Sequence, residues 1–372
     1  AVTVARMVQN RDTINNGTYL GKGKIEELRT EILMYEATGI VCDDELSPIQ
    51  LKNLEDMLDT KVMDRTMVIL DIFAGRASTK EGKIQVELAQ LKYRSSRLIG
   101  MGKSLSKLGG GIGTRGPGEK KLEVDRRIIK ERVAQLNSEL EDVKRHRMEQ
   151  RKHRSNNPTP VVCIAGYTNA GKSTLLNRLT NANVLEEDKL FATLDPTTRS
   201  LTLPNGQEIM ITDTVGFIRK LPHHLINAFR STLEEAKYAD VIIHVVDASN
   251  PQMNKQMTAV YETLESLEIE DKPIITAFNK MDKLENKIEI EDIKANTKVY
   301  MSVVTNEGIS DLLEAVGDIL NQRKIYIEKL YSYTDAGKIQ IIRKYGQLIS
   351  EEYVEDGIFI KAYIDASDES RI

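Results

Sequence analysis

One glycine-rich stretch has the residue types that hold a nucleoside triphosphate. Residues 166–173 read Gly-Tyr-Thr-Asn-Ala-Gly-Lys-Ser, which fits the pattern G-x-x-x-x-G-K-[ST]. Glycines let successive backbone N–H groups turn around phosphate oxygens. Lys172 supplies a positive charge for the β- and γ-phosphates, and Ser173 supplies a hydroxyl ligand for Mg²⁺. The stretch follows an apolar strand and opens a helix predicted over 174–179, so a chance match is a weak alternative. The nucleotide-binding residues predicted here are Gly166, Tyr167, Thr168, Asn169, Ala170, Gly171, Lys172, Ser173 and Thr174.

A second motif ends a predicted strand about 40 residues later. Asp213-Thr214-Val215-Gly216 has the pattern D-x-x-G. Its aspartate serves the Mg²⁺ shell, and the N–H of its glycine can sense the γ-phosphate. The tetrapeptide is common by itself, but its distance from the P-loop and its place at a strand end make it specific. We predict that Lys172 and Gly216 act in catalysis, and that Ser173 and Asp213 bind the metal.

A third motif, Asn279-Lys280-Met281-Asp282, follows a predicted strand and has the pattern N-K-x-D. A carboxylate can accept both the N1–H and the 2-amino protons of guanine. Adenine offers no donors there, so ATP would leave a buried charge unpaired. The sequence therefore predicts GTP as substrate and GDP as product. Ser302-Val303-Val304 lies where G domains usually carry Ser-Ala-x, whose backbone supports the base, and Val303 departs from the usual alanine.

The group that would orient the attacking water is missing from its usual place. Many GTPases carry glutamine directly after D-x-x-G, and this chain carries Phe217. Because a phenyl ring cannot hydrogen-bond water, we predict slow intrinsic hydrolysis that a partner accelerates. A Phe217 that simply packs in the switch is the alternative, and it leaves the orienting group missing as well.

Asn169 makes K⁺ a candidate cofactor besides Mg²⁺. An asparagine at this P-loop position resembles that of G proteins in which K⁺ bridges the phosphates and replaces an arginine finger. The alternative is an asparagine that stabilises the loop geometry.

The segment 191–198 lies between the P-loop helix and D-x-x-G, so it must contain the first switch. A threonine of this switch closes over Mg²⁺ and the γ-phosphate. Thr193, Thr197 and Thr198 compete for that role on the residues alone.

These motifs need a sheet to position them. Short apolar stretches bounded by turn residues alternate with helical stretches, which is typical of a doubly wound, mostly parallel α/β sheet. We assign residues 158–326 to this G domain. Its predicted strands cover residues 161–165, 209–212, 241–246, 274–278 and 299–301.

Three further regions complete a multidomain α/β chain. Residues 1–80 are predicted to form a small α/β unit, residues 81–157 a long helical hairpin, and residues 327–372 a short C-terminal α/β domain. The N-terminal unit is predicted to have strands at 39–42 and 61–63 and helices at 25–37 and 47–58. The C-terminal domain is predicted as strand, helix and strand at 325–331, 336–348 and 357–364.

The predicted hairpin consists of helices over 81–98 and 119–154 with a glycine-rich, basic loop at its tip. Six glycines within residues 109–118 exclude a helix or a good strand there. In the second helix, apolar residues at 129, 133, 136, 140 and 143 follow a spacing of 4, 3, 4 and 3. This heptad seam favours packing along another helix.

Charge is distributed unevenly along the 372 residues. The net charge is −4, yet residues 92–154 hold 18 Lys and Arg against 8 Asp and Glu, a local +10. The asymmetry indicates an element that faces nucleic acid, and the alternative is a solvated pair of charged helices.

The remaining composition indicates a cytoplasmic monomer without a membrane span. No apolar stretch approaches the ~18 residues that cross a bilayer, and the start does not resemble a signal peptide. Cys42 and Cys163 provide no metal or disulfide framework, so each is expected to be a small buried hydrophobe.

The whole chain resembles the HflX family of ribosome-associated GTPases, in the translation-factor-related class near the Obg-type GTPases. The resemblance is carried by Tyr19-Leu20-Gly21-Lys22-Gly23-Lys24, by 109–127, by Phe191-Ala192-Thr193-Leu194-Asp195-Pro196-Thr197 and by Asp213-Thr214-Val215-Gly216-Phe217-Ile218. It implies that Thr193 is the switch threonine, acting in metal binding and catalysis, and that Phe191, Ala192, Leu194 and Asp195 lie at the nucleotide. It also implies residues ahead of the first motif that are missing or short here.

The resemblance further implies binding to the large ribosomal subunit and GTP-dependent splitting of stalled or idle ribosomes, as in a stress response. The hairpin tip would reach rRNA near the peptidyl-transferase centre. The expected rRNA contacts are Lys103, Lys107, Arg115, Lys120, Lys121, Arg126 and Arg127. Three alternatives stay open: a tip loop that regulates its own G domain, an RNA-binding switch in ribosome assembly or hibernation without splitting, and, more distantly, an ATP-driven activity of the N-terminal region.

Overall fold

The computed structural model describes residues 2–10, 13–105, 117–154, 159–180, 197–219, 235–269, 271–284, 290–322 and 324–365. The chain divides into two compact units, the first formed by residues 1–143 and the second chiefly by residues 144–219 and 230–372. Each unit is described by itself. Among the helices in the described ranges, none is long and apolar enough to span a bilayer.

The first unit opens with a small α/β layer, as predicted, but its first helix covers Lys22–Met34 instead of 25–37, and the helix Arg65–Arg76 is an addition. Two short strands pair in parallel, Gly39 beside Lys61 and Cys42 beside Asp64. Ser47 begins the second helix with a capping box, in which its side chain accepts from the backbone N–H of Gln50 and the Gln50 side chain accepts from the N–H of Ser47. The elements are α1 (Lys22–Met34), β1 (Gly39–Cys42), α2 (Pro48–Leu58), β2 (Lys61–Asp64) and α3 (Arg65–Arg76).

A buried carboxylate ties this layer to the helix that follows. Asp64 is fully buried at the end of β2. Its Oδ1 accepts from Met67 N–H at 2.8 Å, which caps α3, and from Tyr93 Oη at 2.8 Å. Its Oδ2 accepts from Arg97 Nη2 at 2.5 Å. The buried charge is thus paired and hydrogen-bonded, as burial requires.

The predicted helical hairpin is formed by α4 (Lys80–Leu105) and α5 (Pro117–Arg154). Leu136 of the heptad seam is buried and packs in one cluster with Ile84 and Leu88 of α4. Arg132 donates to both Glu87 carboxylate oxygens at 2.7 and 3.0 Å. Further along, Arg126 Nη2 donates to the Leu98 carbonyl at 2.7 Å. As the α5 residue number falls, its α4 partner's number rises, so the two helices run antiparallel.

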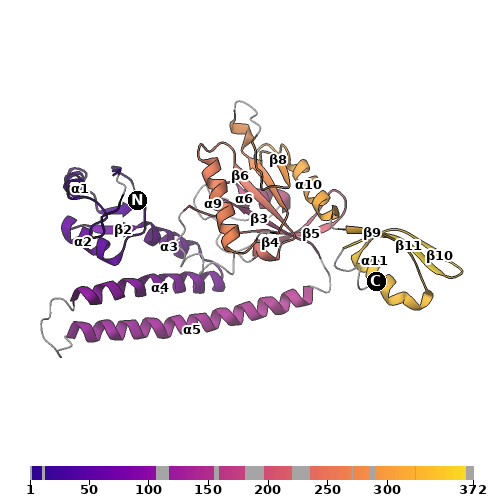
Figure 1. The fold of residues 1–372 in the computed structure, drawn as a ribbon, viewed down its shortest axis with the longest axis horizontal. Helices are drawn as coiled ribbons and strands as arrows, with labels where there is room; N and C mark the ends of the chain where they lie inside the picture. The colour runs from indigo at the N-terminus through magenta and orange to yellow at the C-terminus, as the bar shows by residue number, and fades with distance from the viewer. Residues whose placement is uncertain are drawn as a thin grey trace. The chain divides into compact units, whose positions relative to one another are not determined.

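The second unit contains the central sheet, with strand order β4-β5-β3-β6-β7-β8 (Figure 1). All pairs are parallel except β4 with β5. The predicted strands are confirmed to within two residues at each end, and the antiparallel edge strand β4 is an addition. The strands are β3 (Val161–Gly166), β4 (Thr197–Thr202), β5 (Glu208–Asp213), β6 (Val241–Asp247), β7 (Ile274–Asn279) and β8 (Thr297–Tyr300).

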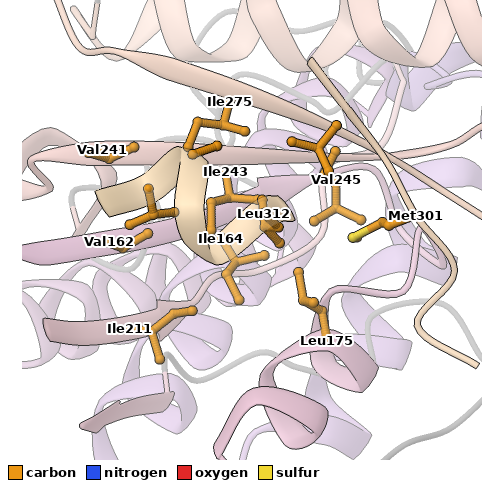
Figure 2. Packing of buried hydrophobic residues seen from close by; sticks show 14 of the residues in the cluster. Val162, Ile164, Leu175, Ile211, Val241, Ile243, Val245, Ile275, Met301 and Leu312 are labelled. Atoms are coloured by element: carbon orange, nitrogen blue, oxygen red, sulfur yellow. The ribbon is translucent and has the colours of Figure 1, made fainter. Parts of the chain in front are cut away.

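The core of this sheet forms because its central strands are apolar on both faces. Val162, Ile164, Ile243 and Val245 of β3 and β6 are at most 1% exposed. Figure 2 shows these side chains packed with Leu175 and Leu312, which come from two of the covering helices. The helices in the described part of this domain are α6 (Lys172–Thr180), α8 (Glu235–Tyr238), α9 (Met253–Ser266), α10 (Ile309–Gln322) and the 3₁₀ turn η1 (Met281–Lys283).

The C-terminal part is a three-stranded antiparallel sheet of order β10-β11-β9 with one helix beside it. The predicted strand–helix–strand order was incomplete here. The helix ends at Tyr345 instead of 348, because Gly346 caps it by donating to the Ile342 carbonyl at 2.8 Å, and an extra strand follows. The elements are β9 (Lys324–Tyr331), η2 (Tyr333–Asp335), α11 (Ala336–Tyr345), β10 (Gln347–Val354) and β11 (Gly357–Asp365).

Candidate nucleotide-binding site

The P-loop leaves the end of β3 and enters α6, and two of its glycines are required by close approach. Gly166 has φ +152°, and a Cβ on it would lie 2.3 Å from the Val245 carbonyl oxygen. Gly171 has φ +100°, and a Cβ on it would lie 2.3 Å from Asn279 Nδ2. A side chain at either position would be strained and would also clash. The glycines therefore bring β3, β6 and β7 together at the carboxyl ends of the strands, where ligands bind in open α/β sheets.

Lys172 is a buried cation at the start of α6, only 6% exposed. Its Nζ donates to the Tyr167 carbonyl at 3.0 Å, which curls the P-loop around the ammonium group. Burial lowers the pKa of Lys172, and the nearby Asp213 carboxylate opposes that shift. An anionic phosphate beside this ammonium would offset its desolvation, so the side chain suits the role that the sequence predicts.

Ser173 and Asp213 meet at the ends of two different elements. Ser173 Oγ of α6 donates to Asp213 Oδ2 of β5 at 2.9 Å. A hydroxyl and a carboxylate are hard oxygen donors, which fit Mg²⁺. The described residues contain no group of three or more His, Cys, Asp or Glu placed to hold a metal. A magnesium ion at this pair would take its other ligands from water, phosphate and further hydroxyls, as Mg²⁺ commonly does.

The D-x-x-G segment lies directly on the P-loop. Phe217 N–H donates to the Gly166 carbonyl at 3.0 Å, and Thr168 N–H donates to the Phe217 carbonyl at 2.8 Å. A Cβ on Gly216 would lie 2.8 Å from Thr168 Cγ2 and 3.0 Å from Lys172 Nζ. Phe217 is 3% exposed, so the residue at the usual glutamine position packs inward, away from solvent.

The N-K-x-D segment is linked to the P-loop by two side chains. Asn279 Nδ2 donates to the Ala170 carbonyl at 2.9 Å, and Asn279 Oδ1 accepts from Val303 N–H at 3.1 Å. Lys280 Nζ donates to the Asn169 carbonyl at 2.9 Å. These bonds connect the P-loop, predicted to bind phosphate, with the ends of β7 and β8, predicted to bind the base.

The last residues of the predicted base site differ in exposure. Asp282 is exposed, so its carboxylate is accessible to a base. Ser302 is fully buried, and its Oγ accepts from Thr305 N–H at 3.2 Å. Val303 is 4% exposed and fills the core, whereas Val304 is 77% exposed. Val303 thus contributes through its backbone N–H, which explains why a valine serves where alanine is usual.

Asn169 adopts a left-handed backbone conformation, with φ +63°. Asparagine tolerates this region better than most residues. The conformation gives a reason for asparagine that is independent of any bound K⁺, in line with the loop-geometry alternative.

Several residues predicted from the sequence cannot be placed. The part of the first switch that contains Phe191, Ala192, Thr193, Leu194 and Asp195 lies outside the described residues, and so do Lys107 and Arg115. The two other candidate threonines, Thr197 and Thr198, lie at the start of β4, where Thr198 Oγ1 is 2.9 Å from Thr212 Oγ1. Lys103 lies in α4 and Lys120 and Lys121 lie in α5, but their side chains are not described. Arg126 contacts the Leu98 carbonyl, and Arg127 Nε lies 3.8 Å from Glu131 within α5.

The sequence predictions missed Asp247, which pairs with Lys280 at 2.8 Å. Its signal was available, because Asp247 ends a mostly apolar strand at the edge where the other motifs gather.

Three family models match the chain. They are described as GTP-binding GTPase N-terminal over residues 1–74, GTP-binding GTPase Middle Region over 76–154, and 50S ribosome-binding GTPase over 161–280.

Among relatives, GTPase HflX of Lacrimispora saccharolytica is 65% identical over 364 residues, covering 98% of this chain and 86% of that protein. GTPase HflX of Caldanaerobacter subterraneus is 48% identical over 372 residues, covering 100% of this chain and 86% of that protein. A solved GTP-binding protein of Sulfolobus solfataricus in complex with GDP is 25% identical and covers 84% of this chain and 89% of its own, at a TM-score of 0.45. On the strength of the sequence relatives, this chain belongs to the HflX family of GTPases and hydrolyses GTP.

Proposed function

We propose that this GTPase binds the large ribosomal subunit through rRNA and uses GTP hydrolysis to split or recycle stalled or idle ribosomes. Two features of the site together support the proposal. The P-loop, D-x-x-G and N-K-x-D segments meet at one edge of the sheet. The residue directly after D-x-x-G, where glutamine is usual, is the buried Phe217. A site built this way has candidate phosphate and base ligands, but the position directly after D-x-x-G offers no side chain that could orient water. It therefore suits an enzyme that a large partner completes.

In this proposal the nucleotide lies along the P-loop. Lys172 stabilises charge on the β- and γ-phosphates, and the N–H of Gly216 contacts the γ-phosphate. Ser173, Asp213 and the switch residue Thr193 would hold Mg²⁺, which would supply positive charge to offset the negative charge of the phosphates. Water adds to the γ-phosphorus, the bond to the β-phosphate oxygen breaks, and GDP and phosphate leave.

Guanine selection is assigned to Asp282, whose carboxylate accepts from the N1–H and 2-amino groups. Replacing it in Asp282→Asn exchanges one acceptor for a donor that faces the guanine donors. We expect GTP and GDP to bind at least 100-fold more weakly, since a site built to pair polar groups rejects a mismatch strongly. Fluorescent-nucleotide titration measures this, and unchanged affinity would contradict the assigned base site.

The first test is GTP turnover by the purified chain, alone and with large ribosomal subunits, in K⁺ buffer. We expect slow turnover alone and at least about tenfold stimulation by subunits, because the ribosome supplies the missing group. Lys172→Ala is the inactive control. Intact GTP binding without any stimulation would contradict the proposed coupling.

Sedimentation separates splitting from its main alternative. Whole ribosomes incubated with the protein and GTP should shift to free subunits on sucrose gradients. Stimulated hydrolysis without subunit separation would instead favour an RNA-binding switch that acts in ribosome assembly or hibernation.

K⁺ dependence is tested by exchanging the monovalent ion. If Asn169 helps to hold K⁺ at the phosphates, turnover should fall several-fold when K⁺ is replaced by Na⁺ at equal ionic strength. Equal rates would assign Asn169 to loop geometry alone, in keeping with its φ of +63°.

A further inference from the structure

A carboxylate outside the recognised motifs holds the lysine of N-K-x-D in place. At the carboxyl end of β6, Asp247 Oδ2 lies 2.8 Å from Lys280 Nζ. The same Nζ donates to the Asn169 carbonyl of the P-loop at 2.9 Å. One ammonium group thus joins β6, β7 and the P-loop.

Asp247 is itself fixed by its neighbours. Its Oδ1 accepts from Ser249 Oγ at 2.6 Å and from Ser249 N–H at 3.1 Å. The turn that carries both residues is bound to β7, because Ala248 N–H donates to the Asn279 carbonyl at 2.9 Å. Both carboxylate oxygens are therefore used, and the carboxylate is aimed at Lys280.

The ion pair is shielded more than an ordinary surface pair. The side chains of Lys280 and Asp247 are 19% and 13% exposed. Shielding strengthens the attraction between the charges and raises the cost of leaving either one unpaired. Lys280 also has a left-handed backbone, with φ +66°, a conformation that a non-glycine residue keeps only when its surroundings fix it.

We propose that Asp247, oriented by Ser249, is a positioning residue that fixes Lys280 between the base-recognition segment and the P-loop and thereby sets how long a guanine nucleotide stays bound. The inference rests on the nucleotide site proposed above. Lys280 lies two residues before Asp282 and touches the carbonyl of Asn169. Holding it rigid preorganises the base and phosphate ligands together, and preorganisation lowers the entropic cost of binding.

The test is the rate of GDP release in a double-mutant cycle. Fluorescent GDP is chased from the full chain with excess unlabelled GDP in the presence of Mg²⁺. Asp247→Asn, which keeps the side-chain shape and removes its charge, should speed release about tenfold, while GTP turnover at saturating GTP changes by less than about threefold. Lys280→Met should speed release at least as much. Because Asp247 acts through Lys280, the double variant should release GDP no faster than Lys280→Met alone.

A matched control lies at the other end of the same strand. Asp240 Oδ2 accepts a hydrogen bond from Val161 N–H at 2.9 Å. Asp240→Asn therefore removes the charge of another hydrogen-bonded aspartate of this domain, at the end of β6 opposite the proposed nucleotide site. It should leave GDP release within about twofold of the parent chain even where it lowers the melting temperature. Ser249→Ala should speed release by less than Asp247→Asn, because the backbone N–H of Ser249 remains.

Two results would overturn the proposal: release within twofold of the parent for Asp247→Asn, or multiplicative effects in the double variant. A different result is expected if the proposed nucleotide site itself is wrong. If Asp282→Asn also leaves GDP affinity and release unchanged, the base site itself is wrong, whereas a strong Asp282→Asn effect beside an inert Asp247→Asn rejects only the positioning role.

Discussion

At the scale of single residues, this site depends on how closely backbones approach one another. Gly171 has a positive φ and lies close to Asn279 Nδ2. The absence of a side chain at Gly171 allows the P-loop to contact the N-K-x-D segment. Gly206, in the turn between β4 and β5, also has a positive φ, +83°, but a Cβ there would meet nothing within 4 Å. Substitutions at Gly171 and Gly206 therefore compare backbone strain combined with a steric clash, at Gly171, with backbone strain alone, at Gly206.

Comparing alanine at these two glycines should show which factor matters for binding. We expect Gly171→Ala to lower GTP affinity at least 100-fold, because the added Cβ displaces Asn279 from the Ala170 carbonyl. Gly206→Ala should cost about 1 kcal/mol of stability through strain and leave affinity unchanged. Nucleotide titration with parallel thermal melts measures both. Equal affinity losses would mean that strain, and not contact, governs the loop.

His244 in the middle of β6 gives the protein a pH-dependent stability. It is 1% exposed, its ring packs edge-on against Tyr261 with centroids 5.0 Å apart, and burial lowers its pKa from 6.5 to about 4. Between those values the unfolded chain binds a proton that the folded chain does not. The stability from neutral His244 is therefore present above pH 6.5 and lost as the pH falls towards 4.

The expected loss is at most about 3.5 kcal/mol across that window, of which about 2 kcal/mol falls between pH 7 and pH 5, since each pKa unit corresponds to about 1.4 kcal/mol. Guanidinium unfolding at pH 7 and pH 5 measures it in the parent and in His244→Gln. The variant should lose less stability than the parent on acidification. Identical losses in both proteins would assign the acid sensitivity to other groups.

At the scale of elements, the described side chains of the helical hairpin meet in an apolar seam and in a bidentate ion pair. Leu136 is 1% exposed and packs with Ile84 and Leu88 of α4. Arg132 donates hydrogen bonds to both carboxylate oxygens of Glu87. Ile128, on the same helix, is 55% exposed. Because so few residues bury the seam, a single cavity should be felt along both helices.

We therefore expect Leu136→Ala to destabilise the hairpin by about 2 to 4 kcal/mol, the usual cost of a buried leucine. Hydrogen exchange of α4 and α5 amides in the full chain reports this opening. Ile128→Ala is the matched control and should change exchange little. If the two variants behave alike, the seam is not the element that holds the helices together.

At the scale of the whole molecule, a nucleotide site and a basic hairpin follow one another along one chain, and the hairpin's second helix, Pro117–Arg154, crosses the boundary between the two compact units at residue 143. Residues 92–154 carry the local excess of positive charge, and the motifs for GTP follow after residue 160. In the proposed function, the basic segment would contact RNA and the following motifs would hydrolyse GTP. The same order along the chain also fits the alternative in which the tip loop controls its own G domain.

Arg115→Glu distinguishes the two roles of the tip loop. If the loop meets rRNA, the charge reversal should lower the stimulation of turnover by large subunits about tenfold, and more so at low salt, because phosphate contacts are electrostatic. GTP turnover measured with and without subunits at two salt concentrations tests this. A rise in turnover without subunits would instead favour a loop that restrains its own G domain.

Where the sequence predictions were incomplete, the missing elements lack a strong apolar pattern. In β10, Ser350, Glu351 and Glu352 interrupt the apolar residues, and backbone pairing with β11 stabilises the strand. β4 lies at the sheet edge, and its side chains are only partly buried or exposed. Edge strands form through ladder hydrogen bonds more than through burial, so their side chains carry little signal.

The sequence by itself determined the fold class, the family and the order of the nucleotide motifs. Strand ends and P-loop patterns are local, and each follows from a few adjacent residues. Only the tertiary structure decided three further facts. Phe217 is buried beside the P-loop, Val303 donates its backbone N–H to Asn279, and Asp247 forms an ion pair with Lys280. Those facts depend on contacts between residues that are 24 to 51 positions apart in the chain. Neither the spacing of motifs nor composition specifies which of these distant residues the folded sheet brings within hydrogen-bonding distance.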